Sequence, residues 1–167
     1  PSPQHNPMEI IMELIKGDEI PQASLAIVDA LNQAVAETTV TTMLAQNFHW
    51  NVTGMAFGPL HDLFQRIYED HFEGQDDLAE RIKAIGGHAQ GTLSGMVARS
   101  KVEEYEGEAT DREMIAAMAT AQETLAETLI GACDIASEKN DKLTEDLCIG
   151  RAREHEKFAW MLKCHLA

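Results

Sequence analysis

The stretch HWNVTGMAFGPLH, residues 49–61, carries a histidine at each end and separates two long segments of helical periodicity. Two glycines and a proline interrupt its middle, and such residues favour turns. On one continuous helix, His49 and His61 would lie about 18 Å apart. A turn instead brings the end of one helix beside the beginning of the next. The stretch therefore predicts a helical hairpin that holds both imidazoles at one end of the fold.

Apolar periodicity on either side of this turn predicts two long helices, over about 22–51 and 59–85. The β-branched run at 38–42 forms helix poorly, but the flanking period continues through it, and propensity is a weak guide. The first helix has an apolar stripe formed by Leu25, Val28, Leu31, Val35, Met43, Leu44 and Phe48. The stripe of the second helix is formed by Leu60, Phe64, Ile67, His71, Leu78, Ile82 and Ile85, with His71 interpreted as a core histidine.

Two further long helices are expected in the second half of the chain. A capping box at 110–113 predicts a third helix to about residue 139, and Asn140 or Asp141 can cap a fourth that runs nearly to the C-terminus. The intervening loop is long enough to cross the molecule, with a helical turn near 96–99. A short helix is expected over residues 6–17.

Four long helices of this kind pack most naturally as an all-α four-helix bundle, here with a long crossover loop and a short N-terminal helix. Internal repeats and low-complexity segments are absent from the sequence. Residues 1–167 are therefore expected to form a single domain.

The charge balance is acidic, with 28 acidic and 13 basic residues and a net charge of −15. This charge attracts cations and argues against a general nucleic-acid binder. No apolar stretch is long enough to span a bilayer and no signal-peptide pattern is visible, so a cytoplasmic protein without membrane partners is expected. The three cysteines, Cys133, Cys148 and Cys164, are odd in number and widely spaced, which favours reduced core thiols.

Asp76 and Glu80 form an i, i+4 pair on the second helix and can share a cation. Asp76 lies about 22 Å along the helix from His61, but only about 60° around it. If two copies pack antiparallel about a two-fold axis near residues 69–70, the histidine end of each meets the carboxylate end of the other. This packing predicts two equivalent sites per dimer. Imidazole and carboxylate ligands suit iron, zinc or manganese, and open positions on iron permit oxidation chemistry.

The quoted stretch, followed by DLFQRIYEDHFEGQDDLAER at 62–81, closely resembles the signature of the Dps family, the miniferritins: HW-N-V-x-G, then LH, then D-x-x-A-E-R. The resemblance covers the whole chain. It implies a ferritin-like bundle assembled as a homo-oligomer, a hollow dodecameric shell. In that family, iron(II) is oxidised preferentially by hydrogen peroxide at ferroxidase centres shared between two-fold-related subunits. The ferric iron is stored as a mineral, which protects DNA from oxidative damage.

The same resemblance assigns residues. The family's ferroxidase ligands correspond to His49, His61, Asp76 and Glu80, and Trp50 matches the tryptophan near the centre. Where the family usually has an aspartate, four residues after the second histidine, this sequence has Gln65. An amide is a neutral and weaker ligand, which puts a second, looser iron position in question. The leading hypothesis is an iron-storing ferroxidase, and the alternative is a structural or DNA-compacting shell with an impaired centre.

Other residues are open to two interpretations. Asp141 and Asp146 match aspartates that line the family's three-fold pores, although an acidic helix start can equally serve capping. The acidic residues of the second helix are either solvated or line a cavity: Asp62, Glu69, Asp70, Glu73 and Asp77. Trp160 and Phe158 are expected in the core and Arg81 in an ion pair or interface.

One motif of the larger ferritins and one feature of the Dps family have no match in this sequence. An E-x-x-H motif does not occur, so the di-iron site within one bundle that larger ferritins use is not expected. The lysine-rich tail through which the family usually binds DNA is not present either, since Lys16 is the one lysine in the first 60 residues. Direct DNA binding is therefore not expected.

Overall fold

The computed structural model describes residues 6–8, 11, 12 and 22–167. This part contains four long helices, α2 (Gln22–Asn51), α3 (Phe57–Ala84), α5 (Asp111–Glu138) and α6 (Lys142–Cys164), and a short helix, α4 (Leu93–Arg99). The predicted all-α four-helix bundle is confirmed, whereas the N-terminal helix predicted over 6–17 lies largely outside the described residues. No described helix is long and apolar enough to cross a membrane.

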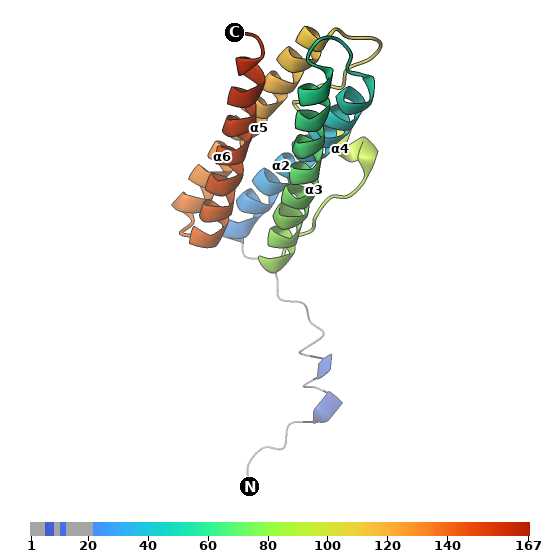
Figure 1. Cartoon of the computed structure of the whole chain (residues 1–167). Helices are drawn as coiled ribbons and strands as arrows, with labels where there is room; N and C mark the ends of the chain where they lie inside the picture. Colours follow the sequence, from blue (N-terminus) through green and yellow to red (C-terminus); the bar gives the residue numbers. More distant parts are fainter. Residues whose placement is uncertain (1–5, 9–10, 13–21) are drawn as a thin grey trace.

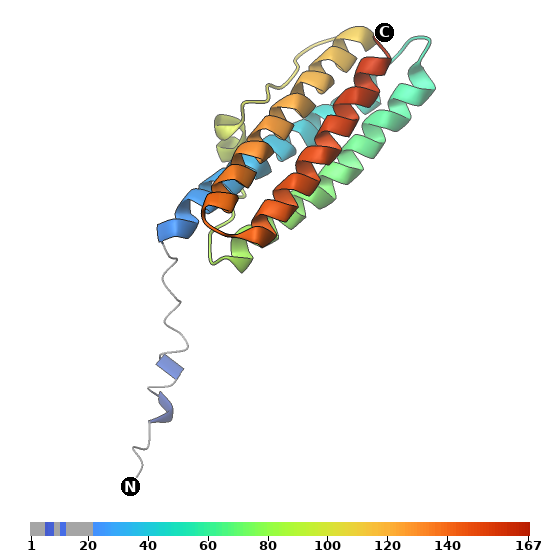
Figure 2. The same cartoon turned by 90° about the vertical axis from the view of Figure 1, so that its left-hand side faces the viewer.

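The helices form two antiparallel hairpins, α2–α3 and α5–α6, joined by the predicted crossover (Figures 1 and 2). The crossover returns along the bundle, so that α5 starts beside the α2–α3 turn and runs in the same direction as α3. The capping box of α5 is present, because the side chains of Thr110 and Glu113 each accept a backbone hydrogen bond from the other residue. Because the α2–α3 turn lies at one end of the bundle, His49 and His61 lie at that end, and Asp76 and Glu80 lie towards the other.

Two apolar clusters fill the core, one towards each end of the bundle. The predicted stripe of α3 is buried except for Ile85, which is half-buried. The threonines of the run at 38–42 lie within the helix, where their hydroxyls donate to carbonyls one turn back. Thr38 donates to the carbonyl of Ala34 at 2.7 Å, and Thr41 to that of Glu37 at 2.8 Å.

Three side chains predicted in apolar stripes or in the core are exposed instead. Leu25 and Met43 lie about 160° around α2 from the buried Ile27, on the side that faces away from the core. Trp160 is 63% exposed, whereas Phe158, two residues earlier on α6, is buried as predicted. A single stripe of helical period therefore does not identify which of its outer members reach the core.

The prediction of core thiols is correct for one cysteine. Cys148 is buried, and burial raises the pKa of its thiol to about 12. Cys133 is half-buried and Cys164 is exposed, and all three are free.

Candidate metal centre

His49, near the end of α2, and His61, near the start of α3, face each other across the α2–α3 turn. Their ring centroids are 3.7 Å apart and their planes differ by 19°. The Nδ1 atom of His49 lies 2.8 Å from the carbonyl oxygen of His61, and the Nδ1 atom of His61 lies 2.7 Å from the carbonyl oxygen of His49. The structure thus brings the two imidazoles together in a nearly symmetric pair.

The reciprocal hydrogen bonds determine which ring nitrogen carries the proton. A carbonyl oxygen can only accept, so each Nδ1 atom must donate. In the neutral imidazole, the Nε2 atom then keeps its lone pair, which is the form in which histidine binds a metal. Hydrogen bonds of this kind also orient the ring of a metal-binding histidine. The pair can therefore offer two nitrogen ligands from one chain.

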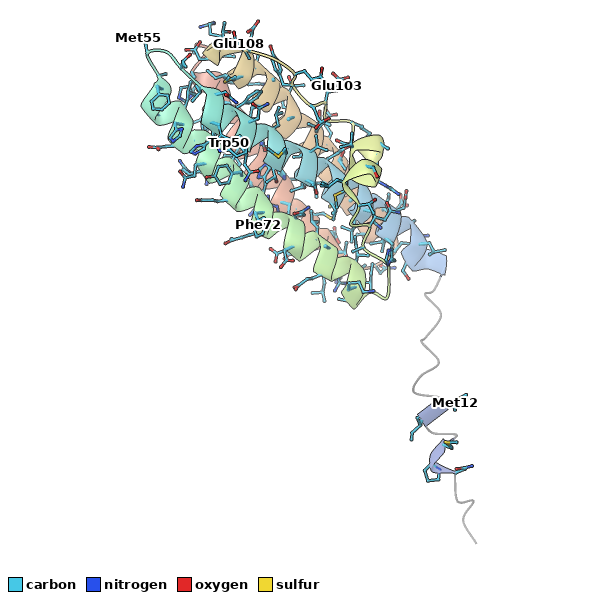
Figure 3. All side chains as sticks on the ribbon, turned by 90° about the vertical axis from the view of Figure 1, so that its right-hand side faces the viewer. Met12, Trp50, Met55, Phe72, Glu103 and Glu108 are labelled. Carbon is cyan, nitrogen blue, oxygen red and sulfur yellow. The ribbon has the colours of Figure 1, made fainter. Side chains whose placement is uncertain are left out.

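Aromatic rings support the pair on both sides. Phe57 stacks on His61 with ring centroids 5.1 Å apart, and Tyr68 meets the ring of His49 edge-on at 5.3 Å. Neither residue was predicted, although their spacing from His61 (i−4 and i+7) places both on its side of α3. Trp50 is 63% exposed on the same hairpin, whose tip carries Met55 (Figure 3).

The two carboxylates of the predicted ligand set are not near the histidines within one chain. Asp76 and Glu80 are exposed on α3, and Asp76 begins about 22 Å from His61 along the helix axis. In the described part of one chain, no group of three or more His, Cys, Asp or Glu side chains is arranged to hold a metal ion. Phe72 lies between the histidines and the carboxylates on α3 and is 68% exposed (Figure 3).

Gln65, one turn after His61, is engaged with the next turn of α3. Its Nε2 atom donates to the Oε1 atom of Glu69 at 2.8 Å. The side chain of Gln65 is half-buried, whereas Glu69 is exposed. An i, i+4 contact of this type could have been found from the spacing alone.

Asp141 acts as the N-cap of α6. Its carboxylate accepts hydrogen bonds from the Thr144 backbone at 3.1 Å and from the Thr144 hydroxyl, and it forms an ion pair with Arg81 at 2.8 Å. Partial burial tends to raise the pKa of Asp141, but the bonds from Thr144 and the charge of Arg81 outweigh it and lower the pKa. The ion pair predicted for Arg81 is confirmed. Asp146 is exposed, and its place in a pore stays a prediction.

A buried polar layer separates the two apolar clusters, and its members come from three helices. Asp70, predicted on the acidic face of α3, is only partly exposed because both terminal nitrogens of Arg151 donate to it at 3.1 and 2.7 Å. The Nδ1 atom of His71 also donates to Asp70, at 3.0 Å. The Gln122 amide extends this hydrogen-bond network. Its Nε2 atom donates to the Nε2 atom of His71 at 2.9 Å. Its Oε1 atom accepts from the Nδ1 atom of His155 at 2.7 Å.

Burial sets the protonation of this layer. Desolvation lowers the pKa of His71 despite its bond to Asp70, and it lowers the pKa of His155 further, with help from the charge of Arg151. Burial alone would raise the pKa of Asp70, but the hydrogen bonds from His71 and Arg151 bring it below its ordinary value. Both histidines are therefore neutral. The Nε2 atom of His155 has no hydrogen-bond partner among the described residues. Apart from the burial of His71, the sequence predicted none of this layer.

Known proteins match both the sequence and the fold. A family model described as a ferritin-like domain matches residues 28–167. DNA protection during starvation protein 2 of Bacillus anthracis is 34% identical over 140 residues, which cover 84% of this chain and 96% of the relative. The structure of Dps from Staphylococcus aureus superposes with a TM-score of 0.82 at 35% identity, covering 84% of this chain and 95% of that one.

A Dps protein from Vibrio cholerae, described as a member of a broad superfamily of ferritin-like diiron-carboxylate proteins, superposes with a TM-score of 0.83. The two sequences are 29% identical, and the match covers 87% of this chain and 91% of the Vibrio cholerae chain. Together with the ferritin-like family match and the Bacillus anthracis relative, these similarities show that the chain belongs to the Dps family of ferritin-like proteins.

Proposed function

We propose that this protein oxidises iron(II) and stores it as a ferric mineral, at centres that are completed by two-fold-related subunits of a homo-oligomeric shell. The observation that carries the proposal is the His49–His61 pair, which leaves both Nε2 atoms free for a metal. Helix α3, which carries His61, also exposes Asp76 and Glu80, far from the histidine pair. Relatives named for DNA protection and a neighbour described as a diiron-carboxylate protein support the same function.

A dimer supplies the carboxylates that one chain lacks at the histidine pair. Antiparallel packing of two α3 helices about an axis near residues 69–70 would bring Asp76 and Glu80 of one copy to the imidazoles of the other. Large apolar side chains on the outer side of the α2–α3 hairpin favour a partner on this face. Met43, Trp50 and Phe72 are 45%, 63% and 68% exposed.

Iron(II) is the substrate of this chemistry. Two imidazoles and two carboxylates leave coordination positions on iron open for an oxidant. Hydrogen peroxide accepts two electrons, so each peroxide oxidises two iron(II) ions and, with two protons, leaves as two waters. Because no single-electron product is released, this route removes iron and peroxide without forming hydroxyl radicals, which is how the protein would protect DNA.

Peroxide titration of the iron-loaded protein tests the proposal. Iron(II) is added to the assembled protein without oxygen, and measured amounts of peroxide follow. We expect consumption of about two irons per peroxide and a soluble ferric product. Equal peroxide consumption by a His49→Ala variant, with precipitation of iron in both samples, would contradict the proposal.

A second function has one observation in its favour. Gln65 replaces the aspartate of the family pattern, so the chain could form a structural or DNA-compacting shell whose centre is impaired. The same titration separates the two functions, because an impaired centre leaves iron to react as it does in free solution.

A further inference from the structure

We propose that Glu69 orients the Gln65 amide so that its carbonyl oxygen, and not its NH2 group, faces the cation position beside His61. The proposal rests on the proposed function of the His49–His61 centre. It makes Gln65 an oxygen ligand for a second cation and Glu69 a positioning residue. The substitution of an amide for the usual aspartate would then weaken this position without abolishing it.

The hydrogen bond between the two side chains fixes the orientation of the amide. The Nε2 atom of Gln65 lies 2.8 Å from the Oε1 atom of Glu69. A carboxylate oxygen can only accept, so the nitrogen of the amide is the atom that faces Glu69. Glu69 lies one turn after Gln65 and His61 one turn before it. The amide oxygen is the atom that this bond leaves free, and in the proposed arrangement it faces the histidine end of α3.

Glu69 has no competing partner in the described part of the chain. Its one hydrogen bond is to Gln65, and none of the ion pairs there includes it, although Arg66 lies on the adjacent turn. Around the α3 axis, Gln65 and Glu69 lie about 40° and 80° from His61. Asp76 lies at about 60°, within the same arc. The pair thus belongs to the side of α3 that carries the proposed ligands.

The orientation decides whether Gln65 can bind a cation. An amide oxygen coordinates a metal through its lone pairs, whereas the NH2 group presents hydrogens and repels a cation. Partners that orient a metal ligand typically change metal affinity by about 10- to 100-fold.

Cobalt(II) titration of the intact assembly without oxygen tests the proposal by calorimetry and by the visible spectrum of the bound ion. We expect the wild-type protein to bind two cobalt ions per histidine pair. Glu69→Ala should leave the first unchanged and weaken the second by about 10- to 100-fold. Glu73→Ala, which removes the same charge one turn further along α3, should change neither. In a Gln65→Asp background, Glu69→Ala should have no effect, because a carboxylate needs no such orientation.

Three results would overturn the orientation role. One is that the Glu69→Ala variant binds its second cobalt ion as tightly as the wild-type protein does. The second is an equal loss on Glu69→Ala in the Gln65→Asp background, which would indicate a simple charge effect. The third is a wild-type protein that binds one cobalt ion per histidine pair. A His49→Ala variant separates these outcomes from failure of the proposed function, since cobalt binding that survives this change unaltered would refute the centre itself.

Discussion

Two pairs of histidines in this protein are held in opposite environments. His49 and His61 sit at the end of the bundle with their Nε2 atoms free, whereas His71 and His155 are buried in the polar layer of the core. The first pair can gain a metal. The second pair cannot gain a proton without placing a charge in a desolvated site, which links its chemistry to the stability of the fold.

This linkage predicts that the protein loses stability in mild acid. Burial lowers the pKa of His71 and of His155 below the ordinary value of 6.5, so the unfolded chain binds protons that the folded chain does not. Stability is therefore full above pH 6.5 and falls as the pH drops below it, by up to about 1.4 kcal/mol per pH unit for each histidine. Asp70 does not contribute in this range, because its pKa is also lowered and its effect begins near 3.8. Urea unfolding from pH 7 to 5.5 at one protein concentration measures the slope.

His155→Leu should remove at least half of this slope, because the pKa of His155 is lowered further than that of His71. His88→Ala, at an exposed position of the crossover, serves as the control and should keep the wild-type slope. An unchanged slope in His155→Leu would show that the pH dependence arises elsewhere.

Among the helices, the contact between α3 and α6 depends on one glycine. A Cβ atom at Gly74 would lie 2.4 Å from Cζ of Arg151 and 2.6 Å from its Nε atom. The guanidinium cannot move aside freely, because Arg151 is 91% buried and its guanidinium donates two hydrogen bonds to Asp70. Gly74→Ala should therefore destabilise the protein by about 1–3 kcal/mol, as expected when an extra methyl group is forced into a filled site.

Gly131→Ala on α5 is the matched control, because nothing lies within 4 Å of the added Cβ atom. It should stabilise the helix by up to about 1 kcal/mol. Unfolding midpoints of the two variants measure the difference, and a Gly74→Ala protein as stable as Gly131→Ala would show that Arg151 relocates without cost.

The helices themselves could be predicted from sequence because each carries local signals: an apolar period, the capping box at Thr110 and the cap at Asp141. The polar layer could not, because Asp70 on α3 and Arg151 on α6 are 81 positions apart in the sequence. The exposure of Met43 was missed for a related reason, since helical period does not distinguish an apolar face that is buried in the core from one that is exposed. The histidine pair was predictable because a single turn joins its two helices.

For the whole molecule, charge predicts weak DNA binding. The net charge of −15 per chain repels phosphates, and each further subunit adds to the repulsion. A gel shift at physiological salt without magnesium should show no tight complex. A magnesium series is the control, because divalent cations can bridge two negative surfaces. Tight binding without magnesium would contradict this prediction.

Assembly predicts a more specific outcome, because the proposed centre takes histidines from one copy and carboxylates from the other. His61→Ala and Glu80→Ala chains should each be inactive when assembled alone. When the two chains are unfolded together and reassembled, each mixed dimer has one centre with both changes and one centre with neither. Random pairing makes half of the dimers mixed, so iron oxidation should recover to about one quarter of the wild-type rate. The same variants mixed after separate assembly should remain inactive. An intact mixed shell with no recovered activity would show that the centre is not shared between subunits.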